Sequence, residues 1–361
     1  MGSDNNSAAK RFGNLLAILL VLVLIILIPG CSKTEGDDES QPEDIESEEE
    51  TAYEDSIYGD ESLGIDAGVD EELRDYRSIL IAGIDNGHRA DMQMVLCMNR
   101  DTGETKLFTV TRSTYMQVGH GETVTIDDHE LEFCKSNRAY EIGDKYDLMK
   151  EINRHLDLNI KEFIGIDWAT TAKLVDLLGG LEVDIESQEM LDAINNLISG
   201  FPDGDAELIP ATGKQTLTGW QAVQYLRVRK YDGGNVLNRE ERSREVVSSL
   251  FEKAKDLSIE EISDIYDEIA DDLDTNVSRN TLTDIFALIA AADIENCASW
   301  PYEYEIRWEP DKYFDYYVPQ TLYSNVKELH ANLFDQQDYL PSTTVQEIDD
   351  KIKDLEDNYL K

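Results

Sequence analysis

Two acidic residues, Asp85 and Asp91, stand in a short polar segment between two apolar stretches of the chain. The segment spans residues 83–91 and also holds an Arg and a His. Carboxylates and loop carbonyls suit Mg²⁺, which often takes few protein ligands and completes its shell with water and phosphate. Loops that follow a buried strand are common ligand sites in α/β proteins. The pattern is compatible with a cation site, but by itself it is more typical of a polar turn held by an Asp–Arg ion pair.

A second group of residues suited to chemistry is a positive cluster in a very acidic chain. Six basic residues fall within eighteen positions, and they are Arg227, Arg229, Lys230, Arg239, Arg242 and Arg244. Arg239 and Arg242 are three apart at a predicted helix start, beside free backbone N–H groups, and Arg227 ends the preceding predicted helix. Guanidinium groups on such elements favour a phosphate site. Surface ion pairing is the alternative, which we accept for Lys230 and Arg244.

The elements that must position these residues alternate between strands and helices. Apolar runs predict strands at 77–84, 92–98, 105–110, 163–166 and 181–185, and helical periodicity predicts helices at 146–156 and 168–178. Two later helices carry start signals, at Thr218 with the capping-box spacing and at Asn238. Interleaved strands and helices predict an α/β fold, an α-β-α sandwich with a central mixed β-sheet flanked by helices.

Charge divides the chain into parts. The formal net charge is -44, from 76 acidic and 32 basic residues, and Thr34 to Leu73 contains no Lys or Arg. Such a segment repels itself and buries little apolar surface, so residues 32–75 are predicted to be a disordered linker, with a solvated charged helix as the alternative. The globular domain is then 76–337, and 338–361 is a charged, helix-prone tail. The acidity argues against nucleic-acid binding, which needs a basic face.

The first 31 residues resemble a lipoprotein-type signal peptide. Lys10 and Arg11 precede an apolar run, Leu15–Ile28, which is shorter than the roughly 17–25 residues of a membrane-spanning helix. The run ends before Cys31 in a sequence that resembles a bacterial lipobox, so Cys31 is the predicted lipidation site. The alternative is a single uncleaved anchor that starts near Phe12. Both place the remaining chain at the membrane, on its extracytoplasmic face.

The other cysteines, Cys97, Cys134 and Cys297, fit no CxxC zinc spacing, and three thiols cannot all pair. They are predicted to be small core residues, although one disulfide stays open.

Several segments together resemble the LytR–CpsA–Psr family over roughly residues 76–335. They occur in the family's order, and they are 79–98, Thr111-Arg112-Ser113-Thr114-Tyr115, Lys135-Ser136-Asn137-Arg138-Ala139-Tyr140, 163–185, Leu217-Thr218-Gly219-Trp220-Gln221-Ala222 through Arg229, and Arg239-Glu240-Glu241-Arg242. The most specific of them are Leu174-Val175-Asp176-Leu177-Leu178-Gly179-Gly180-Leu181-Glu182-Val183 and the later Arg-x-Arg.

The resemblance implies a phosphotransferase that moves a glycopolymer from an undecaprenyl-diphosphate carrier to peptidoglycan at the outer face of the membrane. It implies Mg²⁺, with Mn²⁺ as a substitute, at Asp85 and Asp91, and it makes these two acids and Arg112 the catalytic residues. The implied diphosphate-binding residues are Arg112, Arg227, Arg229, Arg239 and Arg242, with Lys135 at a basic position nearby. The partners would be the lipid-linked glycan, peptidoglycan and the membrane, and no nucleic acid.

Two departures from the family pattern keep other functions open. Ser113 stands where the family usually has Asp, and Val236-Leu237-Asn238 replaces a usual Asp-x-Gly. Loss of acids that orient an Arg can misplace it, and small misplacements are costly in rate. The alternatives are a weak or inactive homologue that binds polyprenyl phosphate or wall glycan, and a polyprenyl-diphosphate hydrolase.

Overall fold

The computed structural model describes residues 60–85, 88–126, 129–201, 207–228, 253, 258–279, 281–282, 298–309 and 314–358. Its centre is a six-stranded sheet in the order β11-β8-β1-β2-β3-β12. The strands are β1 (Tyr76–Ile84), β2 (Ala90–Asn99), β3 (Thr105–Val110), β8 (Glu162–Asp167), β11 (Asp274–Thr275) and β12 (Ala298–Trp300). The β1–β8 and β3–β12 pairs are parallel and the others antiparallel, so the sheet is mixed, as predicted.

Both faces of the sheet are buried, which explains its continuous apolar strands. Along β1, Ile79 and Ile81 belong to one hydrophobic cluster, while Leu80 and Ala82 belong to the other. This alternation follows from the two-residue period of a strand. A sheet covered on both sides is rigid, so the loops at its ends are held by a fixed frame.

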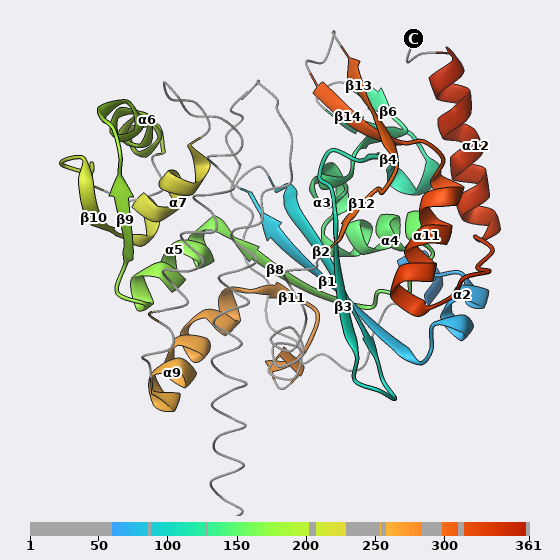
Figure 1. Cartoon of the computed structure of the whole chain (residues 1–361), viewed down its shortest axis with the longest axis horizontal. Helices are drawn as coiled ribbons and strands as arrows, with labels where there is room; N and C mark the ends of the chain where they lie inside the picture. Colours follow the sequence, from blue (N-terminus) through green and yellow to red (C-terminus); the bar gives the residue numbers. More distant parts are fainter. Residues whose placement is uncertain are drawn as a thin grey trace, which may run out of the picture.

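Helices cover each face of the sheet (Figure 1). The first face carries α5 (Trp168–Leu177), α6 (Gln188–Ser199), α7 (Gly219–Arg227), α9 (Ile259–Ile269) and the ribbon of β9 (Leu181–Ile185) and β10 (Gly213–Leu217). The second face carries α2 (Ala67–Glu72), α3 (Ala139–Gly143), α4 (Lys145–Leu156), α11 (Leu322–Phe334) and α12 (Thr343–Asn358). The predicted α-β-α sandwich is confirmed.

Three small antiparallel ribbons and four 3₁₀ turns complete the described part. The ribbons are β4 (Tyr115–Gln117) with β7 (Phe133–Lys135), β5 (Val124–Ile126) with β6 (His129–Leu131), and β13 (Tyr304–Glu309) with β14 (Phe314–Pro319). The turns are η1 (Asp60–Leu63), η2 (Gly119–Gly121), η3 (Ser136–Arg138) and η4 (Ala270–Asp272).

The fold begins earlier than residue 76, which corrects the predicted extent of the linker, 32–75. Residues 60–75 are described, and Leu63, Val69 and Leu73 are at most 4% exposed within the second cluster. Asp66 caps α2 by accepting from Gly68 N at 2.8 Å. A few widely spaced apolar residues therefore anchor an acidic segment that composition alone made look unfolded.

The segment 338–361 was predicted to be a charged C-terminal tail. Its residues through 358 are part of the fold, so the prediction of a tail was wrong for them. Val345, Ile348 and Ile352 on α12 are 0%, 2% and 2% exposed. Their spacing of three and four residues places them on one helix face. The start of α12 is fixed by Asp157, whose carboxylate accepts from Ser342 N at 2.7 Å and from Ser342 Oγ at 2.6 Å.

Within the described residues, Cys97 and Cys134 are buried thiols that form no disulfide, as expected of core residues. Burial raises the pKa of Cys97 to about 12, so this thiol is inert at neutral pH. Cys297 and Cys31 lie outside the described residues. No helix in the described ranges is long and apolar enough to cross a bilayer.

Candidate functional site

Asp85 closes the connection between β1 and β2. Its backbone N–H donates to Arg89 O at 2.9 Å, and its Oδ1 accepts from Arg89 N at 2.9 Å. The β1–β2 register shifts at Gly83 and Ile84, just before this turn. One carboxylate oxygen of Asp85 thus stabilises the loop, and the side chain is only half-buried.

Asp91 is the point where three segments of the chain meet. Its Oδ2 accepts from Arg112 Nη1 in the β3–β4 loop, and its Oδ1 accepts from Asn137 Nδ2 in η3 at 2.8 Å. The side chains of Arg112 and Asp91 are 12% and 22% exposed. Charge-assisted hydrogen bonds at such depth are stronger than those on the surface. The predicted Asp–Arg pair exists, but the Arg comes from outside the 83–91 loop.

A buried polar network holds these segments together. Gln93 Nε2 donates to Ser136 Oγ at 3.2 Å and to Ala90 O at 3.0 Å. Ser136 Oγ donates to Thr111 O at 3.1 Å. Gln93 and Ser136 are at most 1% exposed. The network links β2, the Arg112 loop and η3, so the positions of Asp91, Arg112 and Asn137 depend on one another. We call these three residues the Asp91 cluster.

Several buried polar atoms in and beside the Asp91 cluster have no protein hydrogen-bond partner in the part of the chain that the structure describes. They are Arg112 Nε, Asn137 Oδ1, Ser113 Oγ, Thr114 Oγ1 and Gln93 Oε1. Buried polar groups are nearly always satisfied in folded proteins. A group of such atoms around one ion pair is typical of a site that completes its hydrogen bonds with a polar ligand or bound water.

Lys135 is close in sequence to the Asp91 cluster but is directed to a different neighbour. It ends β7, is 6% exposed, and places its Nζ 6.0 Å from the centre of the Tyr316 ring. A cation at that distance is attracted by the ring. The structure shows Lys135 as a buried cation beside an aromatic ring, and its place in the diphosphate site stays a prediction.

Tyr140 lies in the first turn of α3, the helix that follows Asn137, and its hydroxyl contacts an acid. Its hydroxyl donates to Asp274 Oδ2 at 2.6 Å, and Lys145 Nζ pairs with Asp274 Oδ1. Burial, together with the Asp274 carboxylate, raises the pKa of Tyr140 well above its ordinary value. Tyr140 is therefore protonated at neutral pH, which excludes it as a general base.

Arg227 ends α7, as predicted, and its guanidinium contacts a ring and a side-chain amide. Its guanidinium carbon lies 5.2 Å from the centre of the Phe201 ring, and Nη1 donates to Gln224 Oε1 at 3.0 Å. Phe201 is also 5.1 Å from the Trp220 ring. Arg commonly stacks on aromatic faces, and its planar guanidinium also suits phosphate recognition. The other predicted arginines, Arg229, Arg239 and Arg242, lie outside the described residues.

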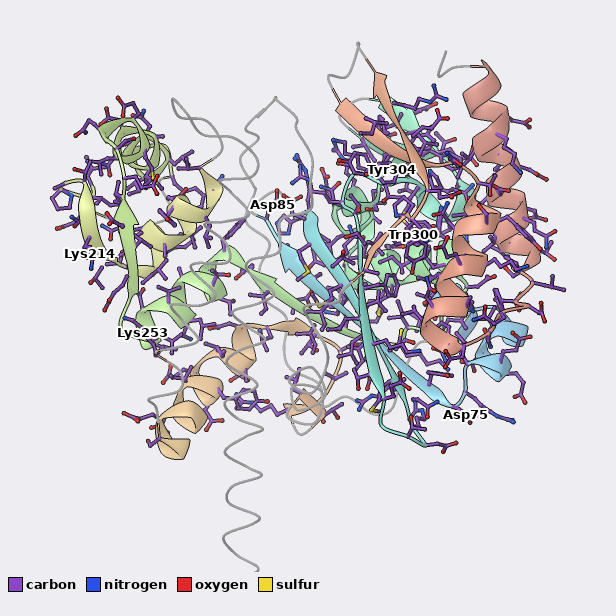
Figure 2. All side chains as sticks on the ribbon, viewed as in Figure 1. Asp75, Asp85, Lys214, Lys253, Trp300 and Tyr304 are labelled. Carbon is purple, nitrogen blue, oxygen red and sulfur yellow. The ribbon has the colours of Figure 1, made fainter. Side chains whose placement is uncertain are left out.

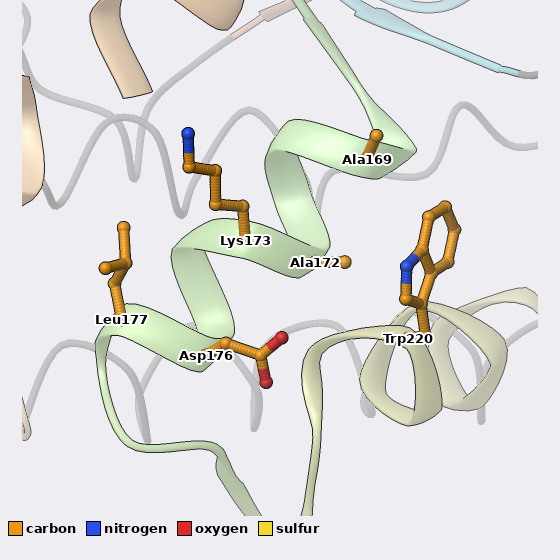
Figure 3. A pocket seen from close by; sticks show the side chains of 6 residues that line it. All are labelled: Ala169, Ala172, Lys173, Asp176, Leu177 and Trp220. Atoms are coloured by element: carbon orange, nitrogen blue, oxygen red, sulfur yellow. The ribbon is translucent and has the colours of Figure 1, made fainter. Parts of the chain in front are cut away.

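An open pocket of about 400 Å³ lies between α5 and α7 (Figure 3). It is lined by Ala169, Ala172, Lys173, Asp176, Leu177 and Trp220. Its charged groups are already paired, since Lys173 Nζ contacts Asp272 Oδ2 at 2.7 Å and Asp176 Oδ1 accepts from Gly219 N at 2.7 Å. None of the predicted site residues lines this pocket, so it is not the predicted site.

The Mg²⁺ prediction rests on two carboxylates. Among the described residues no group of three His, Cys, Asp or Glu side chains could hold a metal ion. Asp91 already accepts hydrogen bonds from Arg112 and Asn137, and Asp85 Oδ1 accepts from Arg89 N. Oxygen donors of this number and kind fit a hard cation that takes its other ligands from water and phosphate, and they do not fit a zinc site.

Sequence reasoning did not assign a role to Asn137 or Gln93. Asn137 was visible only as part of a motif, since nothing in its spacing from Asp91 shows that the two side chains touch. Gln93 carried a signal, because it is the one polar residue in the apolar run 92–98. A buried polar residue in a core strand needs a partner, and here the partners are the site segments.

Comparison with known proteins finds a family model and several relatives that match this chain. The LytR_cpsA_psr family model matches residues 34–332. The Bacillus subtilis polyisoprenyl-teichoic acid–peptidoglycan teichoic acid transferase TagT is 26% identical over 244 residues, covering 64% of this chain and 70% of that protein. TagU of Enterococcus faecalis is 28% identical over 217 residues, covering 58% of this chain and 64% of that protein. The solved structure of YwtF (TagT) with bound octaprenyl pyrophosphate lipid has a TM-score of 0.45 at 22% identity, covering 73% of this chain and 92% of that one.

Proposed function

The chain belongs to the LytR_cpsA_psr family, and from this premise we propose that it transfers a glycopolymer from an undecaprenyl-diphosphate carrier to peptidoglycan. The observation that carries the proposal is the Asp91 cluster, a partly buried Asp–Arg–Asn arrangement surrounded by buried polar atoms without protein partners among the described residues. The names of the curated relatives support the same reaction class.

In the proposed reaction, the oxygen of an acceptor hydroxyl forms a bond to the phosphorus that carries the sugar. The bond from that phosphorus to the bridging oxygen breaks, and polyprenyl monophosphate leaves with the electron pair. The hydroxyl proton passes to solvent. Negative charge therefore accumulates on the leaving phosphate, and fixed positive groups lower the barrier by stabilising it.

Arg112 is suited to that role because Asp91 fixes its orientation. One end of the guanidinium donates to Asp91, whereas Nε has no protein partner among the described residues. Arg227 is stacked on Phe201 and would add a second positive group. We propose that Arg229, Arg239 and Arg242 complete the diphosphate site, and that Lys135 supplies background positive charge.

We propose Mg²⁺, or Mn²⁺ in its place, as the cofactor, held by Asp85 and Asp91. A bound divalent cation would neutralise phosphate oxygens during transfer. Residues 1–31 would place the protein at the membrane, through lipidation at Cys31 or through an uncleaved anchor, with the domain on the extracytoplasmic face. There it would meet both the carrier lipid and peptidoglycan.

The test uses the full-length chain in detergent with a polyprenyl-diphosphate-linked glycan, soluble peptidoglycan strands and Mg²⁺. Release of polyprenyl monophosphate and attachment of labelled glycan are both measured. Arg112→Gln and Arg227→Ala should each lower the rate, by about 10²–10³ for Arg112, the usual cost of losing one such contact. Arg74→Gln is the matched control, since Arg74 is 65% exposed and pairs with Glu71 on the surface. Unchanged rates in both site variants would contradict the proposal.

A second candidate is a binding protein of the same family without catalysis. The observation that favours it is Ser113, which is fully buried, with Oγ unpartnered in the described region, at a position where the family usually has an acid. Tight binding of the lipid diphosphate with no release of monophosphate, weakened by Arg227→Ala, would favour this candidate. Monophosphate release without glycan attachment would favour the third possibility, a polyprenyl-diphosphate hydrolase.

A further inference from the structure

The β13–β14 hairpin has one face in the core and one in solvent. Tyr316 and Val318 on β14 are 3% and 0% exposed and belong to the second hydrophobic cluster. On the opposite face, Tyr304 and Ile306 of β13 are 41% and 58% exposed. Monomeric proteins commonly expose single apolar side chains, and here two large ones stand together on one strand face.

The Tyr304 ring is held in one orientation. It stacks on Tyr317 with ring centres 4.7 Å apart and an angle of 10° between the planes. The register pairs Ile306 with Tyr317, so all three side chains belong to the same face of the hairpin. Because Tyr317 covers one side of the Tyr304 ring and is itself 8% exposed, the other side of Tyr304 forms a flat apolar surface toward solvent. We call Tyr304 and Ile306, backed by Tyr317, the Tyr304 platform.

The platform is joined directly to the loop that carries Arg112. Tyr317 N donates to Ser113 O at 2.9 Å, and Thr114 and Tyr317 form a parallel β-bridge. Figure 1 shows β14 beside β4, the strand that follows this loop, and Figure 2 labels Tyr304 on the hairpin. A molecule bound on the platform therefore lies on an element whose position is fixed relative to the Asp91 cluster.

We propose that the Tyr304 platform is a carbohydrate subsite, which binds an N-acetylated pyranose ring of the acceptor glycan strand. The identity of the acceptor rests on the proposed function. The axial C–H bonds of a pyranose present a weakly positive apolar face that packs on the negative face of an aromatic ring. A rigid ring loses little entropy on binding, which suits a weak sugar contact.

Size favours a sugar ring over a protein partner at the platform. Glu305, the acid next to Tyr304, is in register with the buried Val318 on the other face of the hairpin, and its carboxylate is paired with Arg307 Nη2 at 2.6 Å. Two exposed apolar side chains are far too small an area for a stable protein interface, which needs about 1,200 Å² or more.

The experiment measures binding of tetra-N-acetylchitotetraose to the full-length chain in detergent, by NMR or calorimetry, without donor lipid. Tyr304→Ala should weaken binding about fivefold or more, since stacking of this kind contributes on the order of a factor of ten. Tyr304→Phe should bind within about twofold of wild type because it keeps the ring. Tyr304→Leu keeps an apolar side chain without a ring and should bind as weakly as Tyr304→Ala, and it decides the question if Tyr304→Ala does not fold. Leu340→Ala, at a side chain that is 74% exposed elsewhere, is the control and should bind as wild type does.

Equal binding by wild type and Tyr304→Leu would overturn the inference, as would loss of binding in Tyr304→Phe, which would assign the effect to the hydroxyl. No binding by wild type at millimolar sugar would also overturn it. Because no lipid is present, the result is independent of catalysis. A chain that binds the sugar through Tyr304 but releases no polyprenyl monophosphate would keep the subsite and refute the proposed function.

Discussion

Replacing Asp91 by Asn keeps the size of the side chain but removes the charge that Arg112 contacts. In the native chain both carboxylate oxygens accept, one from Arg112 Nη1 and one from Asn137 Nδ2. An amide has only one acceptor oxygen, so whichever way it turns, its NH₂ group faces one of the two donors. One hydrogen bond is lost and the other loses its charge.

The magnitude follows from the burial of the pair. Hydrogen bonds to a charged group contribute about 1.5–3 kcal/mol each, and a side chain that is 12% exposed is poorly screened by water. We expect Asp91→Asn to lower the free energy of unfolding by about 2–4 kcal/mol, which is a fall in melting temperature of roughly 5–10 °C for a domain of this size. We also expect polyprenyl monophosphate release to slow by about 10²–10³, because Arg112 loses its orienting partner.

Circular dichroism follows the thermal transition, and monophosphate release is measured on the same preparations with and without Mg²⁺. Asp101→Asn is the matched control, because Asp101 is an exposed acid in the β2–β3 turn, and it should change stability by no more than about 0.5 kcal/mol. A melting temperature that stays constant or rises would refute the reasoning, since it would mean that Arg112 does not stabilise Asp91. Lower stability with an unchanged rate would make the pair a structural ion pair, which is the simpler alternative that the sequence left open.

Other perturbations test other parts of the fold. Gly219→Ala would place a Cβ 2.0 Å from Ala172 O, so we expect α5 and α7 to be forced apart and the melting temperature to fall by several degrees. Burial lowers the pKa of His155 to about 4 from 6.5, so only the unfolded chain takes up this proton between pH 6.5 and 4. The free energy of unfolding should therefore fall by on the order of 3 kcal/mol as pH drops through that window, and His155→Gln should remove this part of the slope in urea titrations. Deletion of 343–361 should destabilise the whole domain, because it removes the buried apolar residues of α12 and exposes the apolar surface that they cover, whereas a detached tail could be removed without a change in melting temperature. Ser113→Asp should raise a detectable transferase rate if the chain is a weakened enzyme, and an unchanged rate would contradict that interpretation.

The sequence predicted the sheet well because its strands are buried on both faces. The run Arg77 to Ile84 contains a continuous apolar stretch without alternation. The structure places it in β1, between the antiparallel strand β2 and the parallel strand β8. The start of α7 was also readable, since Gln221 Oε1 accepts from Thr218 N at 2.9 Å, as its spacing indicated. These features depend on residues close together in the chain, and a single sequence contains that information.

The site was only partly predictable because its contacts are between distant residues. Asp91 and Arg112 were both candidates, but their direct contact depends on how the β3–β4 loop returns over β2. Asn137 stands 46 positions from Asp91, and no local pattern connects them. The same reason explains α12, where acidic residues dominate the composition while the apolar face that packs on the domain is narrow.

The contact between Asp91 and Arg112 bears on whether the chain is active. The concern raised by Ser113 is that an acid which orients Arg112 is missing. In the structure Arg112 is oriented by Asp91, an acid from a different strand, so its position does not depend on residue 113. A carboxylate at 113 would be fully buried and would be tolerated only if it were paired, and Arg112 Nε, unpartnered among the described residues, is a suitable donor. The serine therefore removes one hydrogen-bond acceptor of the guanidinium and leaves the other acceptor, Asp91, in place. This arrangement favours a transferase of reduced rate over a protein that only binds the lipid.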